Sequence, residues 1–250
     1  MAGNFTEKFV PTTLQDFFVK TRSYFFGLLS ILFLLLLYEG FSAALYENQP
    51  TEVRNSAELI FKRTFSYIGP YGSWLLWTIY FLLLVWAYWQ AKNQQQLDFK
   101  FIYFIYIIFE SALYALAFGV LVSQLTAYSA SLLTIQASTP ATDVSGKVLL
   151  AIGAGVYEEL FFRFMLISFL LLIFNRMAGG NRPVYIVLTI FIAAALFSGF
   201  HYVGGREVYT FDSFLFRFYW GVILGSLFVV RGLGVAVYTH TIYDMLLIFR

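Results

Sequence analysis

Two histidines and a group of acidic residues are the side chains of this sequence best suited to chemistry. His201 and His240 are the only histidines among the 250 residues. Glu158 and Glu159 precede them, and Asp244 follows His240 by four residues, on the same face of a helix. A carboxylate gathered with two imidazoles can activate water, because it takes up a proton as a general base and returns it as a general acid. The imidazoles can position that water, stabilise an oxyanion or bind a metal.

Each of these residues also has a structural interpretation. Arg163 lies four residues after Glu159, so the two can form an ion pair, and we favour a structural role for that pair. One arginine does not need two carboxylates, which leaves Glu158 for function. His201 ends an apolar segment, where a hydrogen-bonded interfacial histidine and a catalyst are both open interpretations. His240 lies deep in an apolar segment beside an acid, which favours function.

The elements that carry these residues are predicted to be membrane spans. The sequence is 60% hydrophobic and only 12% charged, whereas a soluble domain carries about a quarter charged residues. A span needs about 20 mostly apolar residues. We therefore predict an all-α, polytopic transmembrane helical bundle of about seven spans. The predicted spans cover residues 24–45, 71–89, 101–122, 148–174, 184–201, 211–230 and 233–249.

The connections between the spans divide the chain. Residues 50–70 have the pattern of an amphipathic interfacial helix, and residues 123–147, rich in Ser, Thr and Ala, are predicted to form a solvated loop. We expect residues 1–147 to be an accessory transmembrane region and 148–250 to be the catalytic membrane core. Ser42-Ala43-Ala44 resembles a signal-peptide cleavage site, but the further spans argue against cleavage. Helix rise places Glu158 and His240 each about 15 Å from the same membrane face.

Several classes of function are excluded or disfavoured. The sequence lacks cysteine, so disulfides, thiolate metal sites and a cysteine nucleophile are excluded. The net charge of +2 gives no reason to expect nucleic acid as a partner. The His-Glu-x-x-His motif of zinc proteases and the serine and aspartyl motifs of other intramembrane proteases are missing. Four further charges in the predicted spans are interpreted as packing or cavity-lining groups: Glu39, Glu110, Asp212 and Arg217.

Three motifs in order resemble the CPBP family, which contains CAAX prenyl endopeptidases, bacteriocin-processing proteins and Abi-type membrane proteins. They are Glu158 through Arg163, Phe197 through His201, and His240 through Asp244. The resemblance covers residues 148–250. It implies that Glu158 and His201 activate the water, that Glu159, Arg163 and Phe197 support the site, and that His240 and residue 244 stabilise the oxyanion.

Residue 244 departs from the family pattern, because Asp244 stands where the prenyl endopeptidases carry Asn. An ionised aspartate cannot donate a hydrogen bond to an oxyanion. Asp244 must therefore be protonated, orient His240 or ligate a metal. No cofactor is required by the sequence. Zinc stays open, with Glu158, His201 and His240 as its ligands.

We therefore expect an intramembrane endopeptidase, of glutamic or metal-dependent type, that cleaves a membrane-associated protein or lipidated peptide. We expect it in a bacterial inner membrane, with its oligomeric state left open. Eight basic residues against six weakly favour a cytoplasmic N-terminus, which would turn the pocket outward. The alternative is a non-catalytic immunity or scaffold protein, or a proton or ion carrier, that uses the same Glu and His cluster.

Overall fold

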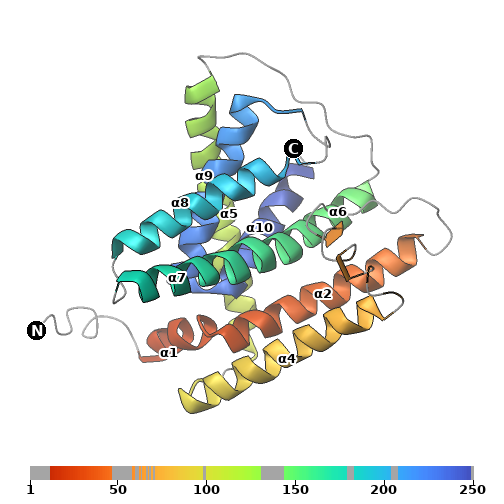
Figure 1. The fold of residues 1–250 in the computed structure, drawn as a ribbon, viewed down its shortest axis with the longest axis vertical. Helices are drawn as coiled ribbons and strands as arrows, with labels where there is room; N and C mark the ends of the chain where they lie inside the picture. The colour runs from red at the N-terminus through yellow and green to blue at the C-terminus, as the bar shows by residue number, and fades with distance from the viewer. Residues whose placement is uncertain are drawn as a thin grey trace, which may run out of the picture.

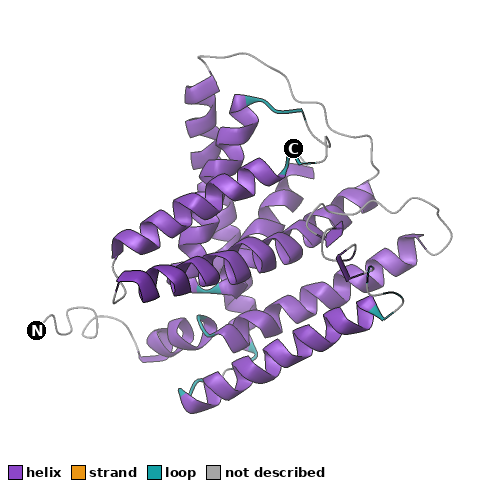
Figure 2. Ribbon diagram, in the orientation of Figure 1, coloured by secondary structure: helices purple, strands orange, loops and turns teal. Residues whose placement is uncertain are grey.

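The computed structural model describes most of the chain and confirms the all-helical prediction. It covers residues 12–46, 71–97, 100–130, 144–178, 183–203 and 208–248, together with seven single positions between 58 and 69. Every regular element in these ranges is a helix (Figure 2). The helices are α1 (Thr12–Thr21), α2 (Tyr24–Tyr46), α4 (Gly72–Asn93), α5 (Ile102–Ala130), α6 (Val144–Gly153), η1 (Ala154–Ile167), α7 (Ser168–Ala178), α8 (Pro183–Phe200), α9 (Phe211–Arg231) and α10 (Leu233–Ile248).

The predicted spans correspond to these helices. Six segments of the described chain are long and apolar enough to cross a membrane, and α10 is a shorter apolar helix, which agrees with about seven spans. The six segments are Tyr24–Leu45, Trp74–Asn93, Ile102–Tyr128, Val144–Met177, Pro183–Phe200 and Phe211–Arg231. The protein is therefore an integral membrane protein.

Two layers of helices cross each other (Figure 1). In one layer the order is α4, α2, the continuous segment α6–η1–α7, and α8. Helices α5, α9 and α10 cross behind it, so that α10 packs against α2, α5, α6, η1 and α9. Every residue of α10 from Leu233 to Thr241 is buried, as expected for a helix that is apolar on all sides. Its 16 residues extend only about 24 Å, less than the hydrocarbon thickness of about 30 Å.

Helices from both parts of the predicted domain division contact one another. Ser111 of α5 donates to the carbonyl of Val235 in α10 at 3.2 Å, and Glu110 pairs with Arg231 of α9. The division at residue 147 stays a prediction.

Two predicted connections differ from the structure or lie largely outside it. The predicted loop 123–147 is too long, because α5 continues to Ala130 and α6 begins at Val144. The Ser and Thr residues that suggested a loop are accommodated in the helix, where Ser123 Oγ donates to the carbonyl of Val120 at 2.8 Å. Residues 131–143 and most of the predicted interfacial helix at 50–70 lie outside the described residues.

The segment that carries Glu158 is a π-helix rather than the α-helix that the sequence suggested. Segment η1 closes its turns with i→i+5 hydrogen bonds, a geometry that is rare and concentrates at functional sites. It also lies very close to α10. A Cβ atom placed on Gly155 would lie 1.9 Å from Thr241 Oγ1 and 3.1 Å from the backbone nitrogen of that residue. Only a glycine fits this crossing.

Substituting Gly155 is therefore expected to destabilise the protein. Gly155→Ala forces η1 and α10 apart, and overpacking of this kind costs about 1–3 kcal/mol. The measurement is the thermal unfolding midpoint in detergent. Gly40→Ala in α2 is the matched control, because nothing lies within 4 Å of its added Cβ atom, and it should be neutral or slightly stabilising. Equal midpoints for the two variants would contradict the close crossing.

Candidate active site

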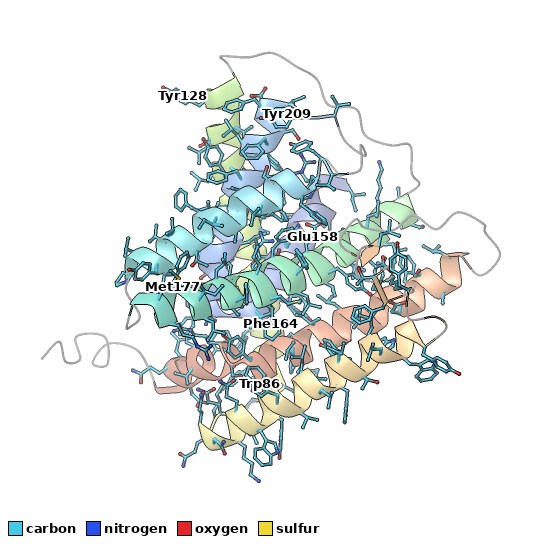
Figure 3. All side chains as sticks on the ribbon, viewed as in Figure 1. Trp86, Tyr128, Glu158, Phe164, Met177 and Tyr209 are labelled. Atoms are coloured by element: carbon cyan, nitrogen blue, oxygen red, sulfur yellow. The ribbon has the colours of Figure 1, made fainter. Side chains whose placement is uncertain are left out.

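Glu158 lies at the centre of the candidate site, and its two oxygens face two different imidazoles. The residue is 4% exposed and lies near the middle of the molecule (Figure 3). Its Oε1 is 3.8 Å from His201 Nε2, and its Oε2 is 3.9 Å from His240 Nε2. Both separations exceed hydrogen-bond length. Polar groups at this spacing are commonly bridged by a water molecule.

His201 is held at the end of α8 by its own helix. Its Nδ1 lies 2.9 Å from the carbonyl oxygen of Phe197. A carbonyl only accepts hydrogen bonds, so Nδ1 carries the proton and donates it. In the neutral ring, Nε2 then presents its lone pair toward Glu158. The side chain is 17% exposed, which makes it more accessible than Glu158 or His240.

His240 is held from the opposite side by Glu159. Its Nδ1 is 2.7 Å from Glu159 Oε1, a bond that the sequence did not indicate. The same oxygen lies 2.9 Å from Arg163 Nη1, so the expected ion pair is present. The angle between the two groups is outside the range of a hydrogen bond. Glu159 and Arg163 are almost completely buried. Glu159 therefore joins the η1 segment to α10 through the second histidine.

Phe197 packs at the junction of these groups. The guanidinium carbon of Arg163 lies 4.3 Å from its ring centroid, which is a cation–π distance. The rings of His201 and His240 contact it edge-on, at centroid distances of 5.0 and 6.2 Å. Phe197 is 2% exposed. One aromatic side chain thus limits how Arg163 and both imidazoles can move.

Asp244 lies beside the nitrogen of His240 that faces Glu158. Its Oδ2 is 3.5 Å from His240 Nε2, and its side chain is 28% exposed. The other ring nitrogen is already bonded to Glu159. Asp244 is therefore close to the His240 nitrogen that faces Glu158, and its role stays a prediction.

Three of the other four charges in the predicted spans, Glu39, Glu110 and Arg217, have hydrogen-bond partners. Arg231 binds both oxygens of Glu110, at 2.6 and 2.7 Å. Glu39 accepts a hydrogen bond from the Tyr157 hydroxyl at 3.0 Å. Arg217 donates to a backbone carbonyl one helical turn before it. These contacts agree with the packing roles expected for Glu39 and Glu110.

The zinc ligand set proposed from the sequence has suitable donor types but not a suitable arrangement. The imidazoles of His201 and His240 both turn Nε2 toward Glu158, as ligands would. Among the described residues, however, no group of three or more His, Asp or Glu is arranged to hold a metal ion. We therefore derive no chemical step through a metal, and zinc stays a prediction that metal analysis of the purified protein can test.

Comparison with known proteins identifies the region that contains this site. Residues 140–246 match the family model described as Type II CAAX prenyl endopeptidase Rce1-like. The match spans Glu158, His201, His240 and Asp244. No curated protein and no solved structure matches the chain. The C-terminal region of this membrane protein is thus Rce1-like, which confirms the resemblance seen in its three motifs.

Proposed function

We propose that this protein is an intramembrane endopeptidase in which Glu158 activates a water molecule. The Rce1-like match supports a CAAX-type intramembrane protease in general. The observation that carries the mechanism is the position of Glu158, which is buried and faces one imidazole nitrogen with each oxygen.

The space between Glu158 and His201 suits the attacking water. Glu158 Oε1 and His201 Nε2 are 3.8 Å apart, and both can accept a hydrogen bond. One water molecule can donate one proton to each of them. Its oxygen lone pair then points away from both groups, toward a substrate carbonyl carbon. Holding the nucleophile in this geometry lowers the entropy cost of attack.

The steps of hydrolysis follow from these positions. The water oxygen bonds to the carbonyl carbon while Glu158 takes the water proton, and the carbonyl electrons move to oxygen. Glu158 then returns that proton to the peptide nitrogen as the carbon–nitrogen bond breaks. The products are a carboxylic acid and an amine, so the atoms balance and Glu158 is restored.

His240 is the group we assign to the oxyanion. Two buried carboxylates, Glu158 and Glu159, lie at the site with one buried guanidinium, Arg163, so a protonated His240 ring offsets the excess negative charge. Its Nε2–H then points into the pocket and can donate to the oxyanion. Asp244, beside the same nitrogen, adds negative charge that stabilises the protonated ring.

The proposed substrate is a membrane-associated protein or lipidated peptide, because the site lies within a membrane-embedded bundle. The proposed location is a bacterial inner membrane. The side on which substrates are cleaved depends on the orientation of the chain. A topology reporter fused at residue 135 distinguishes a cytoplasmic from an external pocket.

The experiment that tests the proposal compares membrane proteomes. Cells with the parent protein and cells with Glu158→Gln are analysed for protein termini, with Glu39→Gln as a control for loss of a carboxylate elsewhere. We expect at least one membrane-associated protein to stay unprocessed only in the Glu158→Gln cells. Identical termini in all three strains would contradict hydrolysis and favour the non-catalytic alternative.

A further inference from the structure

A second polar site lies at the start of α2, separate from the candidate active-site residues. A half-open cavity of about 330 Å³ is formed where the α1–α2 junction meets the last turn of α4. That volume reaches the lower limit of about 300 Å³ for small-molecule pockets. Tyr24, which lines the cavity, contacts Phe164 of η1 at a ring-centroid distance of 5.8 Å, and none of the candidate active-site residues lines the cavity.

The cavity has an apolar floor and a polar rim. Ala87 and Ala91 of α4 are almost fully buried, and their small side chains leave the space open. The rim carries donor groups from the α1–α2 junction and from the end of α4 and the residues after it: Arg22, Ser23, Gln90, Gln94 and Gln96. No carboxylate is among the described residues that line the cavity.

Arg22 is held in position at this rim. Its Nη2 donates to the carbonyl of Val229 near the end of α9, at 3.0 Å. A guanidinium has five N–H donors, so this bond orients the group and leaves donors for a ligand. The neighbouring cation, Lys20, pairs with Asp16 at 2.9 Å. Arg22 is thus the charge that the cavity presents.

The position of the cavity decides what can fill it. Both α2 and α4 are long enough to cross a membrane, so the start of α2 and the end of α4 lie at the membrane surface. Figure 3 labels Trp86 on the part of α4 that leads to this end, and its ring contacts Tyr24 at a centroid distance of 5.8 Å. Tryptophan and tyrosine are typical of the interface. A site at this depth meets the glycerol and phosphate groups of lipids.

We propose that this cavity binds the headgroup of an anionic phospholipid. The phosphate accepts hydrogen bonds from Arg22, Ser23 and the glutamine amides, because charge-assisted bonds from a guanidinium favour phosphate. The glycerol region lies against Ala87 and Ala91. Basic cavities between spans are a recognised form of lipid site. A bound lipid would join the α1–α2 junction, α4 and the end of α9.

Thermal unfolding in a neutral detergent tests the proposal. Phosphatidylglycerol is titrated against phosphatidylcholine and inorganic phosphate, using the parent protein, Arg22→Gln, Ala91→Leu and Lys92→Gln. Lys92 is the matched control, because it is an exposed cation in the last turn of α4 that does not line the cavity. We expect phosphatidylglycerol to raise the unfolding midpoint of the parent protein and of Lys92→Gln equally.

The variants at the cavity should respond differently. Arg22→Gln should weaken the apparent affinity for phosphatidylglycerol about tenfold or more, the usual effect of losing a charged hydrogen bond. Ala91→Leu fills the floor of the cavity and should also weaken the apparent affinity for phosphatidylglycerol. If Arg22→Gln fails to fold, the response of Ala91→Leu tests the proposal. The proposal is overturned if phosphatidylcholine or inorganic phosphate gives the same shift. It is also overturned if both cavity variants respond like the parent, or if Lys92→Gln loses the response as Arg22→Gln does.

Discussion

Glu158→Gln is expected to lower kcat/KM for a membrane-anchored peptide substrate by at least about 100-fold while leaving the bundle folded. The glutamine amide has nearly the same shape as the carboxylate but cannot take a proton from water, and general base catalysis typically contributes 10²–10⁴-fold. The folded state should not suffer, because a buried neutral amide is less costly than a buried charge. The measurement is the initial cleavage rate of the purified variant, with its thermal unfolding recorded in parallel.

Glu39→Gln is the matched control for this experiment. It makes the same chemical change at a carboxylate that bonds to Tyr157, the residue directly before Glu158, and pairs with Lys62. Lys62 retains its contact with Glu58 at 2.8 Å, so the charge removed at residue 39 is tolerated. We expect activity within about threefold of the parent, given the few tenths of a kcal/mol that a half-exposed pair contributes. A folded Glu158→Gln protein that cleaves at the parental rate would refute the assignment of Glu158 as the base.

The second large effect is expected at Glu159, where stability and activity should both fall. Glu159→Leu leaves the Arg163 guanidinium without its buried counterion, and breaking such a pair from one side costs about 3–5 kcal/mol. It also removes the acceptor that holds His240 Nδ1 at 2.7 Å. The free energy of unfolding is measured by denaturant titration in micelles, alongside the cleavage rate.

The double variant Glu159→Leu with Arg163→Met separates the two contributions. Replacing both members of a buried ion pair by apolar side chains is often neutral or stabilising, so most of the lost stability should return. Activity should stay low, because His240 Nδ1 has lost the carboxylate that holds it. If the double variant is as unstable as the single one, the ion pair does not account for the loss. If it recovers full activity, Glu159 does not position His240.

The sequence predicts the composition of this site better than its internal connections. Spacing within one helix is readable, and it placed Glu159 with Arg163 and His240 with Asp244, as the structure has them. The bond between Glu159 and His240 joins residues 81 positions apart. It depends on how η1 and α10 are rotated about their axes, which periodicity does not specify. The spacing assigned Arg163 to Glu159, but it did not indicate which groups Glu158 would face.

The shape of η1 is another feature that the sequence could not provide. Apolar periodicity distinguishes a helix from a strand, but the residues that would form an α-helix over 154–167 also form the wider turns that are observed. The close approach of Gly155 to α10 exists only in the assembled bundle. By contrast, the number of long apolar helices follows directly from hydrophobicity, because the bilayer leaves the backbone few alternatives.

The burial of α10 has a consequence for biosynthesis. This short helix carries His240 and Asp244, and polar groups of this kind cost about 2.5–3.5 kcal/mol each when inserted alone. The described helices that α10 contacts precede it in the chain. During synthesis α10 can therefore insert against helices that are already present instead of into lipid alone. We expect chains arrested before Leu233 to be inert even with Glu158 and His201 in place. The proposed peptidase activity would then require that α10 has been synthesised and packed against the other helices.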